Sequence, residues 1–197
     1  CNYRDEILDF CGDASFQSAL GKTQGALEPN EFWYFWRRFI PSKELRHLDT
    51  VELGRVRGGE LAAELAAIED VFQKPLALKG MILQLNIPFL DRLFENVLFL
   101  FVKRHPFYNV QSVLESRVRF FGSRQEWYSI KPLEYAWLKN LDPIEQVCGQ
   151  VYFTLQRIES GLAQVEPSRK LTIDYERFCA DPGSAYNRLV ERLSQQG

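Results

Sequence analysis

Apolar residues recur at helical spacing in several parts of the chain. Between residues 60 and 73 they fall on one helical face, and Pro75 ends the pattern. Between residues 142 and 164 a longer apolar pattern begins with Asp142, a helix-capping residue, followed by a first-turn proline. These patterns predict two amphipathic helices, of which the second is the more strongly marked.

An aromatic run spans residues 30–40. Its Phe32, Phe35, Trp36 and Phe39 recur at positions i, i+3, i+4 and i+7, which predicts a helix. We expect these rings to belong to the core, and the alternative is that they form a wall of an acceptor-binding site. Residues 41–59 carry polar residues and glycines, so they are expected to be a connecting or lid segment.

Apolar runs of a different kind follow. Residues 76–80 (LALKG) and 97–103 (VLFLFVK) are short and apolar, and a helical pattern lies between them. The second run does not alternate, which is typical of a strand covered on both faces in a parallel sheet. Residues 169–174 predict a further strand, and Asp181 with the proline after it predicts the start of a last helix.

The alternation of strands and helices favours an α/β fold with a parallel sheet in one helix-rich domain, residues 1–197. We expect residues 1–75 to form a helical, acceptor-side region and residues 76–197 to form a nucleotide-binding α/β core. Ligands of such folds bind at the carboxyl ends of the strands.

Composition excludes some classes of function. The chain of 197 residues is 46% hydrophobic, and its 24 basic and 26 acidic residues nearly cancel, so nucleic acid is not an expected partner. No apolar run is long enough to span a membrane. The four cysteines show no metal-binding spacing, so neither a metal site nor a disulfide framework is indicated. We expect a cytoplasmic protein, although two disulfides in a secretory compartment stay an alternative.

Arg104 follows the strand predicted at residues 97–103 and precedes a helix. The free N–H groups and the dipole at a helix N-terminus favour an anion, and arginine adds a planar set of donors. Ser112 lies on the expected polar face of that helix, with His105, Asn109 and Ser116. The pattern predicts a phosphate site formed by Arg104 and Ser112. The alternative is a surface arginine and an ordinary helix serine.

Residues 98–117, LFLFVKRHPFYNVQSVLESR, resemble the 3′-phosphate-binding strand, turn and helix of sulfotransferases that use 3′-phosphoadenosine 5′-phosphosulfate (PAPS). Arg104, Pro106, Ser112 and Arg117 stand where that family has its Arg-x-Pro turn, a serine eight residues after the arginine, and a later arginine. His105 replaces the usual acidic residue. The resemblance extends over residues 76–193 and includes KLTIDYERFCADP in the C-terminal part.

The resemblance implies a P-loop-like fold and an enzyme that moves a sulfuryl group from PAPS to a hydroxyl or amine. The acceptor would be a small molecule, a carbohydrate or a lipid, and no metal would be needed. Arg104 and Ser112 would bind the 3′-phosphate of the donor. An ATP-using kinase of related architecture and a non-catalytic nucleotide-binding or interaction module are the alternatives. The oligomeric state is open.

One part of the family pattern is missing. The family's N-terminal strand and phosphate loop, which hold the 5′-phosphosulfate, have no match before residue 76. Gly21-Lys22-Thr23 lacks the first glycine of a phosphate loop, because Phe16 stands at that position, so we interpret it as a turn. We therefore expect the domain to be incomplete at its N-terminus, with the strand and loop encoded before Cys1.

The resemblance also suggests catalytic residues. Many family members use a Glu or His shortly after the first helix as the base for the acceptor, and Glu28 and Glu31 occupy a comparable region. His47 is a further alternative for the base. Lys79, at the end of the strand predicted at residues 76–80, is a candidate for neutralising sulfate charge.

Overall fold

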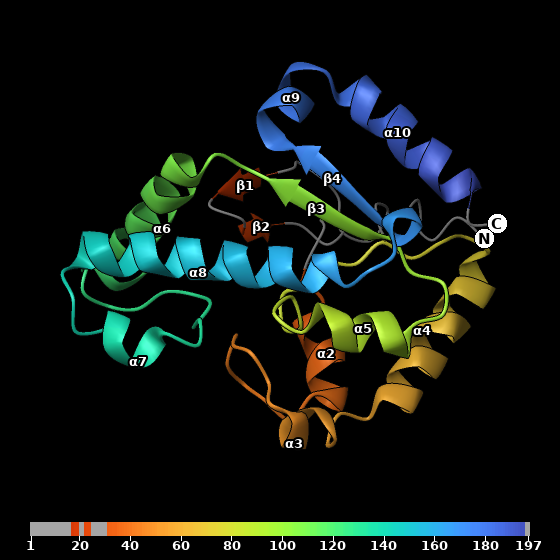
Figure 1. Ribbon diagram of the computed structural model, residues 1–197, viewed down its shortest axis with the longest axis horizontal. Helices are drawn as coiled ribbons and strands as arrows, with labels where there is room; N and C mark the ends of the chain where they lie inside the picture. The colour runs from red at the N-terminus through yellow and green to blue at the C-terminus, as the bar shows by residue number, and fades with distance from the viewer. Residues whose placement is uncertain (1–16, 20–21, 25–30, 196–197) are drawn as a thin grey trace.

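The computed structural model describes residues 17–19, 22–24 and 31–195 (Figure 1). The elements in chain order are β1 (Gln17–Ala19), β2 (Lys22–Gln24), α2 (Trp33–Phe39), α3 (Thr50–Leu53), α4 (Gly58–Phe72), α5 (Ile87–Leu93), β3 (Phe99–Lys103), α6 (Pro106–Phe121), α7 (Tyr135–Leu138), α8 (Pro143–Ala163), the 3₁₀ turn η1 (Pro167–Arg169), β4 (Lys170–Asp174), α9 (Tyr175–Ala180) and α10 (Pro182–Ser194).

The parallel pair β3 and β4 organises the C-terminal part. Phe99 pairs with Lys170, and the register runs without a break to Lys103 and Asp174. The chain between the two strands passes through α6, α7 and α8, as a parallel connection requires. In Figure 1 α8 lies on one side of the strands, and α9 and α10 lie on the other. The α/β class expected from the sequence is confirmed.

Two details of the predicted sheet are wrong. Residues 76–80 form no strand, and Leu76 and Leu78 instead pack against the main core from a segment without regular secondary structure. The strand β3 is not covered on both faces, because Leu100 is 44% exposed and Val102 is 53% exposed. Successive side chains of a strand point to opposite faces, so only the face with the phenylalanines is packed against helices.

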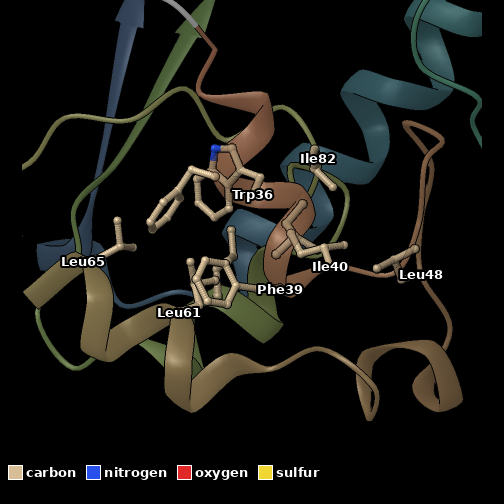
Figure 2. Close-up of a cluster of buried hydrophobic side chains, with 10 residues drawn as sticks. Trp36, Phe39, Ile40, Leu48, Leu61, Leu65 and Ile82 are labelled. Carbon is tan, nitrogen blue, oxygen red and sulfur yellow. The ribbon is translucent and has the colours of Figure 1, made fainter.

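The main hydrophobic core surrounds α2 (Figure 2). Phe35, Trp36 and Phe39 are almost fully buried, and Leu61 and Leu65 of α4 pack against them. The predicted helix and its core role are confirmed for these three rings, which leaves them no surface for an acceptor. The helix α4 also agrees with its prediction, although its expected apolar face becomes exposed at the last turn.

Residues 41–59 form a connecting segment anchored to this core. Its short helix α3 begins with a capping box, in which Asp49 and Glu52 each accept a hydrogen bond from the other's backbone N–H. Leu48 is fully buried, and both of its backbone polar groups bond to the side chain of Asn86. The N–H donates to Oδ1 and the carbonyl accepts from Nδ2, each at 2.9 Å. These two hydrogen bonds fix residues 41–59 to the start of α5, so the segment is not a free lid.

A buried arginine joins α6 to α8. Arg117 is fully buried and donates to Oε1 of Gln146 at 2.8 Å and to Oε1 of Gln150 at 3.5 Å. It also donates to the carbonyl of Arg124, and its guanidinium lies 5.0 Å from the ring of Trp127. Burial lowers the pKa of Arg117, because the charged form loses its hydration.

This network changes the buried face of α8. The predicted helix is confirmed, with Asp142 accepting from the N–H of Ile144. Of the apolar residues that recur between residues 142 and 164, however, Ile144 and Cys148 are exposed. Gln146 and Gln150 are buried in their place. A buried guanidinium requires acceptors, so polar residues occupy positions that a hydrophobic pattern would assign to solvent.

We predict that Asn86→Ala lowers the free energy of unfolding by about 1–3 kcal/mol, because it leaves the buried N–H and carbonyl of Leu48 without partners. Urea denaturation followed by circular dichroism measures the change. The matched control is Asn96→Ala at an exposed position, which should stay within about 0.5 kcal/mol of wild type. Equal stability of the two variants would contradict the anchoring role of Asn86.

Candidate active site

Arg104 lies at the carboxyl edge of the parallel pair. Because Lys103 and Asp174 are the last paired residues, Arg104 and Tyr175 are the first residues beyond the ladder. The guanidinium carbon of Arg104 lies 5.2 Å from the ring centre of Tyr175 and 5.5 Å from that of Tyr108 on α6. Two aromatic rings therefore hold this guanidinium at the strand end, as cation–π geometry allows.

The contacts with these rings do not occupy the N–H hydrogen-bond donors of Arg104. Its Nε is buried and has no hydrogen-bond partner among the residues that the structure describes. Within the same residues, no carboxylate forms an ion pair with its guanidinium. A buried N–H without an acceptor is costly in free energy, so the side chain is well suited to bind an anion with several oxygens.

The N-terminus of α6 differs from its prediction. The first N–H groups are not free, because the N–H of Phe107 donates to Nδ1 of His105 at 3.3 Å. The N–H of His105 in turn donates to Oε1 of Glu176 at 3.1 Å. Any affinity for an anion here thus depends on the side chain of Arg104 more than on the helix end, where the charge of Glu176 already lies.

Ser112 lies on α6 one turn after Tyr108. Residues four apart share a helix face, so Ser112 is on the side of α6 that carries the ring under Arg104. Ser112 is half-buried, and its carbonyl accepts a hydrogen bond from the hydroxyl of Ser116 at 2.8 Å. Ser116 is buried, so the expected polar face is wrong at that position.

Tyr175 has a second neighbour close to the strand end. A hydrogen bond with the thiol of Cys179 raises the pKa of the Tyr175 hydroxyl, and the positive charge of Arg104 opposes that rise. Tyr108 and Tyr175 were not predicted as partners of Arg104. The i+4 spacing of Tyr108 from Arg104 was a usable signal, whereas the contact with Tyr175 depends on the strand register, which the sequence does not reveal.

Two of the catalytic candidates meet in the structure. Nζ of Lys79 lies 2.6 Å from Oε1 of Glu31, and the indole N–H of Trp33 donates to Oε2 of the same carboxylate at 2.6 Å. The side chain of Glu31 is 23% exposed. The negative charge of Glu31 also raises the pKa of Tyr128, after the larger effect of burial, so Tyr128 lies near this pair. Glu28 lies outside the described residues.

This pair and Arg104 are separate clusters. Over residues 31–195, no hydrogen bond, ion pair or ring contact joins Glu31 or Lys79 to Arg104 or Ser112. His47, the third alternative for the base, contacts Arg157 on α8 instead. Each carboxylate oxygen of Glu31 has two lone pairs and accepts one hydrogen bond, so both keep one for a further donor.

Two residues of the Gly21-Lys22-Thr23 sequence lie in a short antiparallel strand pair. Lys22 and Thr23 belong to β2, which pairs with β1 in an antiparallel ladder. The turn predicted at these residues is therefore wrong for Lys22 and Thr23, whose backbone is extended. A phosphate loop lies between a strand and a helix N-terminus, and these residues are not in such a position.

The chain belongs to the sulfotransferase family, whose model matches residues 42–196. That range contains Lys79, Arg104 and Ser112 but not Glu31. Among solved structures, the sulfotransferase domain from the curacin biosynthetic pathway has the same fold, with a TM-score of 0.50 and 22% sequence identity. The match covers 68% of this chain and 44% of that one, so the chain spans less than half the length of this relative. No curated protein matches the chain significantly by sequence.

Among the described helices, none is long and apolar enough to cross a bilayer. In the same part of the chain, no three His, Cys, Asp or Glu side chains gather where a metal ion would need them.

Proposed function

We propose that the chain takes part in sulfuryl transfer from PAPS to a hydroxyl or amine acceptor, with Arg104 and Ser112 binding the 3′-phosphate of the donor. The observation that supports this most strongly is the position of the Arg104 side chain and its set of contacts. Its guanidinium lies at the carboxyl edge of a parallel strand pair, in contact with two tyrosine rings, and its buried Nε has no acceptor among the described residues. Membership of the sulfotransferase family supports the reaction class.

The chemistry of Arg104 fits a phosphate. The rings of Tyr108 and Tyr175 fix the guanidinium, so its planar set of N–H donors needs little further ordering when a tetrahedral oxyanion arrives. A phosphate oxygen would supply the acceptor that Nε lacks. The hydroxyl of Ser112, on the same side of α6, would donate one neutral hydrogen bond.

On the acceptor side, Glu31 takes the proton of the acceptor hydroxyl or amine. PAPS supplies the sulfuryl group, and adenosine 3′,5′-bisphosphate leaves when the bond between sulfur and the phosphate oxygen breaks. The proton moves to a carboxylate oxygen of Glu31 while the acceptor atom forms its bond to sulfur. Lys79 lies 2.6 Å from the same carboxylate and offsets negative charge that develops as the sulfuryl group moves. Glu28 remains the alternative base.

The two alternatives are an ATP-using kinase and a non-catalytic nucleotide-binding or interaction module, and the bound nucleotide helps to distinguish them. A kinase would be stabilised by ADP, whereas a sulfotransferase would be stabilised by adenosine 3′,5′-bisphosphate alone. Thermal unfolding with each nucleotide distinguishes them. A module without catalysis would bind the bisphosphate but transfer no sulfuryl group to any acceptor.

We predict that Arg104→Ala weakens binding of adenosine 3′,5′-bisphosphate about ten- to a hundredfold, because a charged hydrogen bond to phosphate contributes roughly 1.5–3 kcal/mol. Ser112→Ala should cost less, about 1 kcal/mol, since its hydroxyl is neutral. Calorimetric titration measures both, and Arg119→Ala, at an exposed position on the same helix, is the control. AMP lacks the 3′-phosphate and should bind wild type and Arg104→Ala alike. Equal losses for AMP and the bisphosphate would place Arg104 elsewhere.

We further predict that Glu31→Gln lowers kcat by about 10²–10⁴-fold, because an amide cannot accept the proton. Bisphosphate affinity should hardly change, since Glu31 makes no contact with Arg104 in the described structure. Steady-state kinetics with a sulfate acceptor measures kcat, and Glu28→Gln is the matched control. Full turnover in Glu31→Gln would move the base to Glu28 or His47.

A further inference from the structure

A second polar site lies between α5 and the C-terminal half of α8. The structure contains a cavity of about 220 Å³ there, lined by His47, Arg92 and Arg157 together with apolar and uncharged polar side chains. Liquid water occupies about 30 Å³ per molecule, so the cavity has room for a small organic molecule. Figure 1 shows α5 beside the end of α8 that leads to β4, away from the edge where Arg104 lies.

No described carboxylate forms an ion pair with the two exposed arginines of this cavity. Of the residues that line it, none is acidic, and over residues 31–195 neither Arg92 nor Arg157 forms an ion pair with a carboxylate. Arg157 instead contacts Nε2 of His47, which is a neutral acceptor only while the imidazole is unprotonated. Two arginines and a histidine around one cavity create a positive potential that favours an anion.

The neighbouring carboxylates are already engaged. Glu52 forms an ion pair with Arg46 and accepts the N–H of Asp49. Asp49 accepts the N–H of Glu52 through Oδ1. Neither is therefore free to swing into the cavity and neutralise Arg157 without losing these bonds.

The cavity walls are held in place by buried contacts. The side chain of Asn86 bonds both backbone groups of Leu48, which fixes the position of His47 beside it. Gly161 lets α8 approach α5 closely, since a Cβ there would lie 3.1 Å from Cβ of Ile87. The core therefore fixes the walls of the cavity, and the exposed side chains of Arg92 and Arg157 lie at its surface.

We propose that this cavity binds a small organic anion, with an oxyanion head between His47, Arg92 and Arg157 and an apolar body against Leu53, Leu85 and Phe89. The head would be a carboxylate, phosphate or sulfate group, which share the oxygens that arginine binds. The inference does not depend on the proposed role of Arg104.

The surroundings of His47, which shift the pKa of its imidazole, also support the proposal. Burial and then the charge of Arg157 lower its pKa, and Arg46 acts in the same direction, while Asp49 and Glu52 oppose the shift. Arg92 also lines the cavity. Because an anion favours the protonated imidazole, binding should draw a proton onto His47. Affinity should therefore increase as the pH falls through the range where His47 titrates.

Benzenesulfonate is a suitable probe, because its sulfonate stays ionised over the whole pH range and benzenesulfonamide is its neutral analogue. NMR titration of the full chain should show binding of the sulfonate and not of the sulfonamide. Arg92→Gln and Arg157→Gln should each weaken binding about ten- to a hundredfold, as expected for a lost charged hydrogen bond. Arg104→Ala and Arg119→Gln should bind like wild type. Equal melting temperatures of the free variants verify that they fold.

Lowering the pH from about 7.5 to about 5.5 should tighten binding at least about threefold in wild type and not in His47→Gln. Three results would overturn the proposal: no binding to wild type, equal binding of the neutral sulfonamide, or loss of binding in Arg104→Ala but not in Arg157→Gln. The last result would assign the anion to the Arg104 site, and failure of the cavity leaves the bisphosphate experiment unaffected.

Discussion

The pairing of β3 with β4 is the constraint on which the candidate nucleotide site depends. The register that joins Lys103 to Asp174 makes Arg104 and Tyr175 neighbours, although 70 residues separate them in the sequence. A parallel ladder has no tight turn to fix its register, so packing has to do it. Phe99 and Phe101 supply that packing against the cluster of Ile87, Leu162 and Val165. A slip by one residue would bring the exposed face of β3 into this core and move Arg104 away from its aromatic partner.

The second element of the site is α6, and its direction is set far from Arg104. Arg117 near the other end of the helix is fully buried and bonds to two glutamines of α8. A buried charge with specific acceptors permits few alternative orientations, whereas apolar contacts alone permit sliding. Arg117 thus acts through the helix on the position of Tyr108 and Ser112. It is a positioning residue in this arrangement, and nothing in its contacts gives it a role with a ligand.

Much of the fold was predictable because its signals are local. Helical periodicity and caps identified α2, α4, α5, α8 and α10, and an uninterrupted apolar run identified β3. The wrong predictions concern residues whose local structure or burial is decided by tertiary contacts. Leu76 and Leu78 satisfy an apolar pattern by packing without a strand partner, and Gln146 is buried because Arg117 needs it. At the site, Arg104 was predictable from the end of a strand, whereas the contact between Glu31 and Lys79 joins residues 48 positions apart and has no local signal.

The two proposed sites share one feature: each contains arginines without a carboxylate partner among the described residues. Arg38, Arg46 and Arg169 each form an ion pair with a carboxylate, so their charges are balanced within the protein. Exposed arginines keep their hydration, so they need no partner within the protein. Arg104 differs from both groups, because it is only half-exposed and no carboxylate among the described residues forms an ion pair with it. Arg157 is exposed, and it lines a cavity whose lining residues include no acid. In a chain of net charge −2 acidic residues are abundant, so the lack of a carboxylate partner for these two arginines among the described residues does not reflect a shortage of carboxylates. In both proposals an oxyanion from outside the chain supplies the negative charge. The two sites differ in what else surrounds the ligand: tyrosine faces at the strand edge, and a titratable imidazole in the cavity beside α5 and α8.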